Sequence, residues 1–324
     1  MKPVQSSSLR VLLITFLLGT TLRAQSGPEL MLKPFPKEQL IHTGSGWLIQ
    51  DAGHVRGADQ SARLSFYESS GRVRLFPGNL ASPRVGWDLE FIDIDLGSGP
   101  RFLPGQLIDA SVGAAFPLAK VGDWIFAGAV GLGYAGAAPF GEGSSWYAKG
   151  SALALRQFSE NDALVIMLDY DANRTFLPDV PLPGLEYTKR VSPQLFYVVG
   201  VPVSSVTWKP MDKLSIEVGY IPTEAFHAAI GYEFVKQLSA FGSLEYHSGA
   251  FFIKGLKEND RLLFQQRRAE IGVKWAPRES VGLTAAVGYA WGEEFSVGFD
   301  ARKSTEVADI SDEPYLRLGF EVKF

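Results

Sequence analysis

Two histidines and a glutamate lie in neighbouring segments whose polar and apolar residues alternate. His227 lies in one segment, and Glu245 and His247 lie in the next. If the short turn between them sets the two imidazoles opposite each other, both rings point to the same side, with Glu245 two residues below His247. Two imidazoles and a carboxylate can bind a transition-metal ion or titrate near neutral pH. Because a metal site normally needs a third or fourth well-placed ligand, the alternative is a pair of polar residues that line a pore.

Two pairs of carboxylates each end an alternating segment. Asp93 and Asp95 flank Ile94, and Asp169 and Asp171 flank Tyr170. Oxygen ligands of this kind can hold a hard cation such as calcium. The interpretation that we favour is a solvated, negatively charged rim, because the rim of a folded protein is wet and charged.

Charged residues of both signs fall on the inward side that we assign to further segments. The set comprises Glu217, Glu233, Arg268, Glu270, Lys274, Arg317 and Glu321. Inward charges can select ions or solutes, and they can equally form ladders of ion pairs that hold a narrow interior shut. The residue types alone do not choose between these two roles.

Several other kinds of chemistry are excluded or lack their structural context. The stretch Gly131–Gly136 has the G-x-G-x-x-G spacing of dinucleotide sites, but the following residues read as a loop instead of the helix that would hold a pyrophosphate. The chain has no cysteine, which excludes disulfides and cysteine nucleophiles. Its formal net charge of −4 argues against a nucleic-acid partner. We therefore expect no cofactor, assign no catalytic residue, and favour a protein that is not an enzyme.

The segments that must position these residues read as β-strands. Apolar residues recur at every second position in 214–220, 226–234 and 281–291. The runs 124–135 and 280–291 have about the ten residues that a tilted strand needs to cross a bilayer. Aromatic residues lie where the apolar faces end, as expected for rings at the level of the lipid headgroups. These are Trp124, Tyr134, Tyr170, Trp208, Tyr220, Tyr232, Tyr246, Trp275, Tyr289 and Trp291.

The beginning of the chain has the features of a secretory signal peptide. Lys2 and Arg10 precede an apolar run over 11–18, and Ala24 is the expected cleavage point. The run is too short for a membrane-spanning helix, which needs about 20 apolar residues. We expect three parts: a signal peptide over 1–24, a periplasmic extension, plug or first hairpin over 25–83, and a transmembrane barrel over 84–324.

The lengths of the links between strands predict an up-and-down β-barrel. Short and long links alternate along 84–324, as in a barrel with tight periplasmic turns and longer outer loops. Counting strands in this range gives about twelve. An earlier pair, 61–67 and 72–76, flanks the expected turn 68–71 and makes fourteen the second choice. The predicted fold is thus an all-β, antiparallel transmembrane barrel of about 12 strands, with 14 as the alternative.

The last ten residues, YLRLGFEVKF, have a terminal aromatic preceded by apolar residues at every second position. This segment resembles the C-terminal signal of bacterial outer-membrane β-barrel proteins. The resemblance implies an outer-membrane location and, through Phe324, a partner in the barrel-assembly machinery. A second likeness covers 206–222, which is similar to the "W-x-P, polar turn, alternating strand, Pro" pattern of an uncharacterised outer-membrane barrel family. That family has no established activity.

The function expected from these features is a passive channel or small-solute transporter in the outer membrane. Its partners would be membrane lipid and small ions or solutes. The alternatives are an outer-membrane enzyme of lipase or protease type and a closed barrel with a structural or binding role. The acidic rim pairs, Asp93 with Asp95 and Asp169 with Asp171, predict weak conduction with a mild preference for cations.

Overall fold

The computed structural model describes residues 26–32, 35, 39–79, 82–98, 101–221, 225–257 and 259–324. The expected signal peptide lies outside this part of the chain. The described helices include none that is both long and apolar enough to span a membrane.

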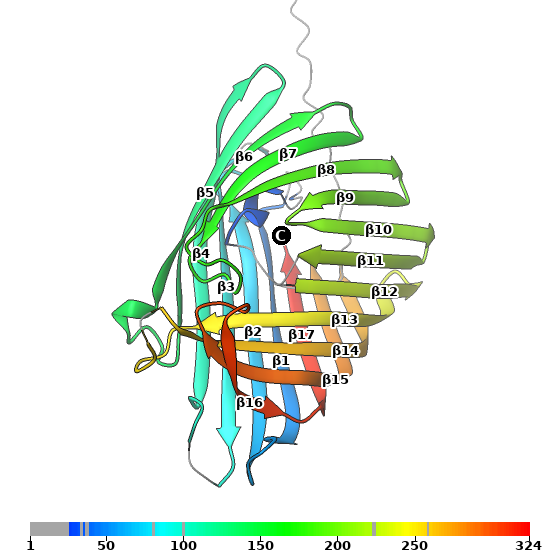
Figure 1. Ribbon diagram of the computed structural model, residues 1–324. Helices are drawn as coiled ribbons and strands as arrows, with labels where there is room; N and C mark the ends of the chain where they lie inside the picture. The colour runs from blue at the N-terminus through cyan, green and yellow to red at the C-terminus, as the bar shows by residue number, and fades with distance from the viewer. Residues whose placement is uncertain are drawn as a thin grey trace, which may run out of the picture.

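One antiparallel sheet closes on itself to form a barrel (Figure 1). Each wall strand pairs with the next along the chain, and β17 pairs with both β15 and β1. Among the described strands, β16 pairs with the end of β15 alone, apart from a single bridge from Ile310 to Val55, and stays outside the ring, so the wall has 16 strands. The strands are β1 (Ile41–His54), β2 (Ser61–Arg74), β3 (Arg84–Leu96), β4 (Gln106–Val121), β5 (Trp124–Gly136), β6 (Trp146–Gln157), β7 (Asp162–Asp171), β8 (Leu182–Ser192), β9 (Leu195–Val201), β10 (Ser204–Met211), β11 (Leu214–Ile221), β12 (Ala225–Val235), β13 (Leu238–Phe251), β14 (Arg261–Arg278), β15 (Val281–Gly298), β16 (Ser304–Ile310) and β17 (Glu313–Lys323).

The predicted count of about 12 strands, or 14, is wrong. The sequence predicts one long link over 172–192, because proline and glycine at 181, 183 and 184 are typical of loops, but β8 lies inside this range. β9 and β10 are joined by only two residues, Pro202 and Val203, at the end of the barrel where long links were expected. Because the sequence shows no long link at this point, counting strands by the lengths of their links treats β9 and β10 as one strand.

The predicted hairpin over 61–76 is also wrong. Residues Ser61–Arg74 form the single strand β2, and the expected turn 68–71 lies within it. β2 pairs along its length with β1 and with β3. Both β1 and β2 precede residue 84 and belong to the wall.

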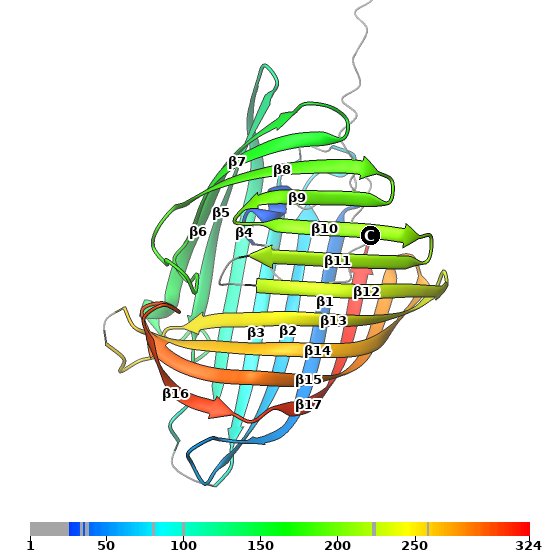
Figure 2. The same ribbon diagram turned by 45° about the vertical axis from the view of Figure 1, so that its right-hand side comes forward.

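The two sides of the barrel cross each other steeply (Figures 1 and 2). β1–β5 run upright at the back of both views, whereas β9–β14 run across the front. This arrangement follows from strands that tilt around a closed barrel. We call the end that carries the links β1–β2, β3–β4, β5–β6, β7–β8 and β13–β14 the loop end, and the opposite end, where β1 begins and β17 ends, the turn end.

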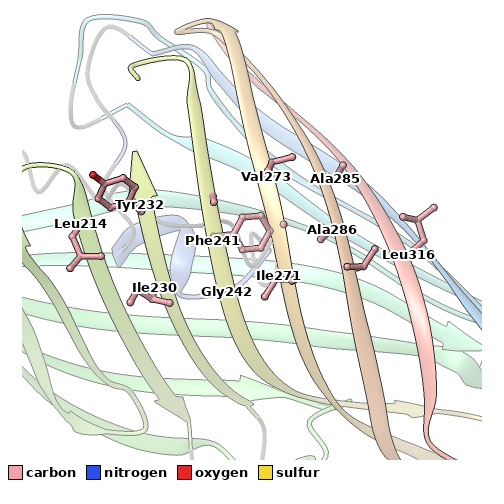
Figure 3. A pocket seen from close by; sticks show the side chains of 13 residues that line it. Leu214, Ile230, Tyr232, Phe241, Gly242, Ile271, Val273, Ala285, Ala286 and Leu316 are labelled. Carbon is pink, nitrogen blue, oxygen red and sulfur yellow. The ribbon is translucent and has the colours of Figure 1, made fainter. Parts of the chain in front are cut away.

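The outer face of the wall is apolar. Along β15, Leu283, Val287 and Tyr289 are exposed on the outside, while Ala286 and Ala290 are buried on the inside. Figure 3 shows an apolar hollow on this outer face, lined by residues of β11–β15 and β17 such as Ile230 and Leu316. A continuous band of large exposed apolar side chains is unusual on a protein surface that meets water.

A short segment that precedes β1 lies inside the barrel. It contains the helix α1 (Glu29–Leu32), and Leu30 of this helix is fully buried against Ala115 of β4 and Ala129 of β5. The neighbouring Met31 packs on Leu153 and on the other buried apolar residues of β6 and β7. This segment is not a strand of the barrel, and it covers part of the inner face of the wall.

Candidate functional site

The loop end of the lumen is filled by aromatic side chains from several strands of the wall. Phe264 of β14 lies with its ring centroid 5.8 Å from that of Phe66 of β2 and 4.9 Å from that of Phe295 of β15. Phe251, at the end of β13, belongs to the same buried cluster. Phe264 and Phe295 lie opposite each other on paired strands, whereas Phe66 reaches the cluster from β2, which β15, β17 and β1 separate from β14.

Two links fold over this aromatic cluster and complete the closure of the loop end. The backbone N–H of Phe252 donates to the carbonyl of Ala135, which ties the end of β13 to the end of β5. In the link after β7, the Asn173 amide donates to the carbonyl of Ala250 at 2.9 Å. The Arg261 guanidinium donates in turn to Asn173 Oδ1 at 3.2 Å.

Below the aromatic cluster lies a layer of polar side chains. Arg268 Nη1 of β14 contacts Glu68 Oε1 of β2 at 3.2 Å. Gln266 donates to Glu293 Oε1 at 2.8 Å and to Gln50 Oε1 at 3.1 Å. Most of these groups are buried, and their hydrogen bonds offset the cost of removing them from water.

A second set of ion pairs lies nearer the turn end. Arg317 of β17 donates to Glu270 of β14, with Nε–Oε2 at 2.8 Å. Glu321 is contacted by Lys274 Nζ at 2.6 Å and by His42 Nε2 at 2.8 Å. The inward charges over β14–β1 therefore form ladders in which β14 and β17 are joined across β15, and β17 is joined to the adjacent β1.

The segment that precedes β1 fills the side of the lumen formed by β3–β7. Ser26 Oγ lies 2.6 Å from Ser111 Oγ, and Arg84 Nη1 donates to the carbonyl of Leu30 at 2.8 Å. The segment fits because the wall residues beneath Ser26 are glycines, which have no side chain. A Cβ atom at Gly113 would stand 2.1 Å from the Ser26 carbonyl oxygen, and one at Gly131 would stand 3.2 Å from it.

Three arginines surround an aromatic ring of the same segment at the turn end. The guanidinium carbons of Arg72, Arg74 and Arg84 lie 4.5, 4.8 and 5.8 Å from the ring centroid of Phe35. Arg74 Nη2 also donates to the Phe35 carbonyl at 2.5 Å. Phe35 and Arg74 are almost completely buried.

The expected pairing of His227 with His247 is wrong. His227 lies opposite Glu245, and Tyr246 lies opposite Phe226. A bulge between Glu233 and Val235 sets this register, which places His247 beyond the partner of His227.

The two histidines therefore do not face each other, although Glu245 lies opposite His227. His247 Nε2 contacts Glu90 Oε1 of β3 at 2.6 Å, across the lumen. Among the residues that the structure describes, no group of three or more His, Asp or Glu side chains is placed to hold a metal ion.

The two carboxylate pairs do not form one rim. Asp93 and Asp95 are exposed on the outer face of β3, whereas the alternating Ile92 and Ile94 are buried inside. Asp169 and Asp171 point inward from β7. Asp169 contacts Arg174 at 2.5 Å, and Asp171 contacts Lys149 at 3.2 Å.

The remaining inward candidates divide by their position along the wall. Arg268, Glu270, Lys274, Arg317 and Glu321 all take part in the ladders described above. Glu217 of β11 is buried, and Glu233 near the turn end of β12 is exposed.

Sequence reasoning missed Phe35 and the three arginines around it. Unbroken alternation over 61–74 would have placed Arg72 and Arg74 on the same face as Leu64 and Phe66. The position of Phe35 had no comparable signal, because its contacts are made with strands that follow it in the chain.

These features define a closed antiparallel barrel with an apolar exterior, a charged interior and an internal N-terminal segment. No family model matches the chain, and no curated protein matches it. Among solved structures, it is similar to the KdgM porin (8% identity, covering 87% of this chain and 99% of the other, TM-score 0.31). It is also similar to an outer-membrane channel from Pseudomonas putida F1 (13% identity, covering 90% of this chain and 97% of the other, TM-score 0.39). A third similar structure is the Pseudomonas putida toluene transporter TodX (12% identity, covering 92% of each chain, TM-score 0.41). At these TM-scores the likenesses carry no information on what this chain transports.

Proposed function

We propose that this protein is an outer-membrane channel for small hydrophilic ions or solutes, held closed in this conformation by its own N-terminal segment. The observation that carries the proposal is that one side of a 16-strand wall is covered inside by residues 26–32 and Phe35. A wall of about 16 strands encloses more space than its own side chains fill. A segment that occupies this space through non-covalent contacts can leave it.

The exterior supports a membrane location for the barrel. Large apolar side chains such as Val130, Leu185 and Val287 are exposed around its circumference. A closed barrel leaves no unpaired strand edge, which is the condition for a sheet to cross a bilayer. The terminal Phe324 lies at the seam, where its N–H donates to the Ile41 carbonyl and its ring is exposed. This position supports recognition of Phe324 by the barrel-assembly machinery.

The interior supports passage of polar rather than apolar cargo once the segment leaves. The face behind the segment carries Ser111, Lys149 and Asp171, together with the arginines of β2 and β3. The aromatic cluster at the loop end is a second obstacle, and its covering link at Asn173 would have to move as well. A closed structural or binding barrel is the rival function, and it requires that neither obstacle moves.

The test is the conductance of the folded protein in planar bilayers. Gly113→Ala is the informative variant, because its Cβ atom would clash with the backbone of Ser26 and displace the segment. Gly150→Ala is the matched control, since a Cβ atom at Gly150 of β6 meets nothing within 4 Å. We expect rare, small openings for the natural chain and for Gly150→Ala, and more frequent openings for Gly113→Ala.

The same recordings can reject the channel. Gly113→Ala protein that migrates as a folded barrel but conducts no more than Gly150→Ala would contradict a role for the segment as a plug. Complete absence of conductance in all three folded proteins would favour the closed structural or binding barrel.

A further inference from the structure

The link between β7 and β8, residues 172–181, is fastened at the loop end by one buried arginine. Arg261 Nη1 donates to Asn173 Oδ1 at 3.2 Å. Arg261 Nη2 donates to the Arg174 carbonyl at 3.0 Å and to the Phe299 carbonyl at 2.8 Å. Arg261 is only 1% exposed. It therefore joins the β7–β8 link to the link between β15 and β16.

The β7–β8 link also has a strained backbone. Leu177 and Asp179 have φ angles of 50° and 59°, in the left-handed region that residues other than glycine rarely adopt. The N–H of Ala301 donates to the Thr175 carbonyl at 2.9 Å, which is a further contact with the link between β15 and β16. Because a strained backbone persists only where its surroundings hold it, the closed position of the β7–β8 link depends on these contacts with neighbouring links.

Asn173 also connects the β7–β8 link to the inner wall beneath the N-terminal segment. Its N–H donates to Asp171 Oδ1 at 2.8 Å, and its side-chain amide donates to Asp109 Oδ2 at 3.2 Å. The other oxygen of Asp171 lies 3.2 Å from Lys149 Nζ. Lys149 Nζ in turn donates to the Ser26 hydroxyl at 3.3 Å. A continuous chain of polar contacts thus runs from the N-terminal segment to the β7–β8 link.

Departure of the N-terminal segment changes the surroundings of this chain of contacts. The side chains of Lys149 and Asp171 are 17% and 21% exposed while Ser26 is in place. Without the segment, water reaches both groups and competes for their hydrogen bonds, and an ion pair in water is weak. Asp171 then holds the Asn173 N–H less firmly, and Asn173 presents its oxygen to Arg261 less often.

We propose that the N-terminal segment and the β7–β8 link are energetically coupled through Lys149, Asp171 and Asn173, so that release of either one favours release of the other. This inference rests on the proposed channel function, because it makes the plug and the cover of the loop end open together. Coupling between two sites is reciprocal in free energy. Loosening the link at the loop end therefore raises the fraction of time that the segment spends away from the wall.

The experiment measures release of the segment as the rate at which a maleimide labels Leu30→Cys in the folded full chain. Leu30 is fully buried, and the natural chain has no cysteine, so this variant has a single thiol that reacts only when the segment leaves. Gly113→Ala displaces Ser26 and should raise the labelling rate. Arg261→Met removes the donors that fasten the β7–β8 link, and we expect it to raise the labelling rate about tenfold.

Arg268→Met is the matched control for Arg261→Met. Arg268 lies on the same strand and is also buried, but its guanidinium contacts Glu68 and Gln266. Its replacement should leave the labelling rate of Leu30→Cys unchanged. This control guards against a variant that merely loosens the barrel as a whole.

Lys149→Met tests whether the chain of contacts carries the coupling. This change removes the ammonium group between Ser26 and Asp171, so it should itself raise the labelling rate. In the Lys149→Met background, adding Arg261→Met should change the rate by less than about twofold, because the contact that transmits the effect is absent.

The labelling rates separate this inference from the channel proposal. Fast labelling in Gly113→Ala without any effect of Arg261→Met, or an equal effect of Arg268→Met, would overturn the coupling and leave the plug in place. An equal effect of Arg261→Met with and without Lys149→Met would overturn the path through Lys149. Absence of labelling in Gly113→Ala would reject both proposals, since the segment then does not leave. The expected rates in a folded barrel that never conducts would uphold the coupling and reject the channel.

Discussion

Arg268 and Glu68 meet inside the barrel although 200 residues separate them in the chain, with Nη1 and Oε1 3.2 Å apart. Arg268 comes from β14 and Glu68 from β2, so β15, β17 and β1 lie between them in the wall. The Arg268 guanidinium also lies 4.5 Å from the ring centroid of Phe66. This pair joins the aromatic cluster of the loop end to the polar layer below it.

Removing the carboxylate of this pair should destabilise the barrel. Glu68→Gln leaves the buried Arg268 guanidinium without its charged acceptor, and we expect the free energy of unfolding to fall by about 1.5–3 kcal/mol. Asp309→Asn is the control, because its partner Arg56 is exposed in the link between β1 and β2, and exposed pairs contribute about 0–1 kcal/mol. Urea titration of the folded proteins in lipid vesicles measures both. Equal losses would mean that the interior is wet enough to screen the inner pair.

The alternation of β15 predicts that arginine substitutions at Val287 and at Val307 differ in their effect on stability. Val287 lies on the outer face of the wall, whereas Val307 lies on β16, outside the ring, and both side chains are exposed. If the wall is in lipid, Val287→Arg should cost about 2–4 kcal/mol near the bilayer midplane. Val307→Arg should change the free energy of unfolding by no more than about 0.5 kcal/mol, as expected for a position in water.

The same vesicle titration compares these two arginine variants. A similar small cost for both would show that Val287 faces water, and the membrane location of the wall would have to be abandoned.

The alternation of β14, β15 and β17 could be predicted from the sequence because a strand has a fixed period of two. Once Val287 is placed outside, Ala286 must point inside, and the structure agrees. The same reasoning placed Arg268, Glu270 and Arg317 in the lumen, where they form ion pairs. Placing these charges inside needed only the side of the wall, and the choice between ion selection and ion-pair ladders, which the sequence left open, needed the contacts.

Register, strand count and the internal segment could not be predicted in the same way. The bulge after Glu233 shifts the partner of His227, and no residue pattern marks it. β8 begins among prolines that also occur in loops. The site of Phe35 depends on β2 and β3 closing around a piece of chain that precedes both, which is a contact between distant residues.

The terminal aromatic predicts a defect in assembly rather than in export. Phe324 is the last residue, and its backbone bonds to Ile41 close the seam between β17 and β1. Deleting Phe324 should lower the yield of folded protein in the outer membrane, because it removes both the seam contact and the assembly signal that the segment resembles. Phe324→Tyr keeps the ring and the backbone and should assemble normally.

Heat-modifiable migration of the membrane fraction measures the folded yield of both variants. Normal migration and yield after deletion would count against the assembly signal. An equal defect in Phe324→Tyr would indicate that the site tolerates no change of ring at all.

The two carboxylate pairs should differ in their effect on ion selectivity. Asp169 and Asp171 point into the lumen, whereas Asp93 and Asp95 are exposed on its outside. A fixed charge concentrates counter-ions within about 10 Å at 0.1 M salt, so only charges that face the conduction path should matter strongly. Changing Asp93 and Asp95 together to Asn should leave the reversal potential in a salt gradient almost unchanged. Changing Asp169 and Asp171 together should shift it toward anions, because Arg174 and Lys149 then lose their carboxylate partners.

The Gly113→Ala background supplies enough open channels to measure both, and the shift should shrink as the salt concentration rises. A larger effect from the outer pair than from the inner pair would show that ions do not pass along the β7 side of the lumen.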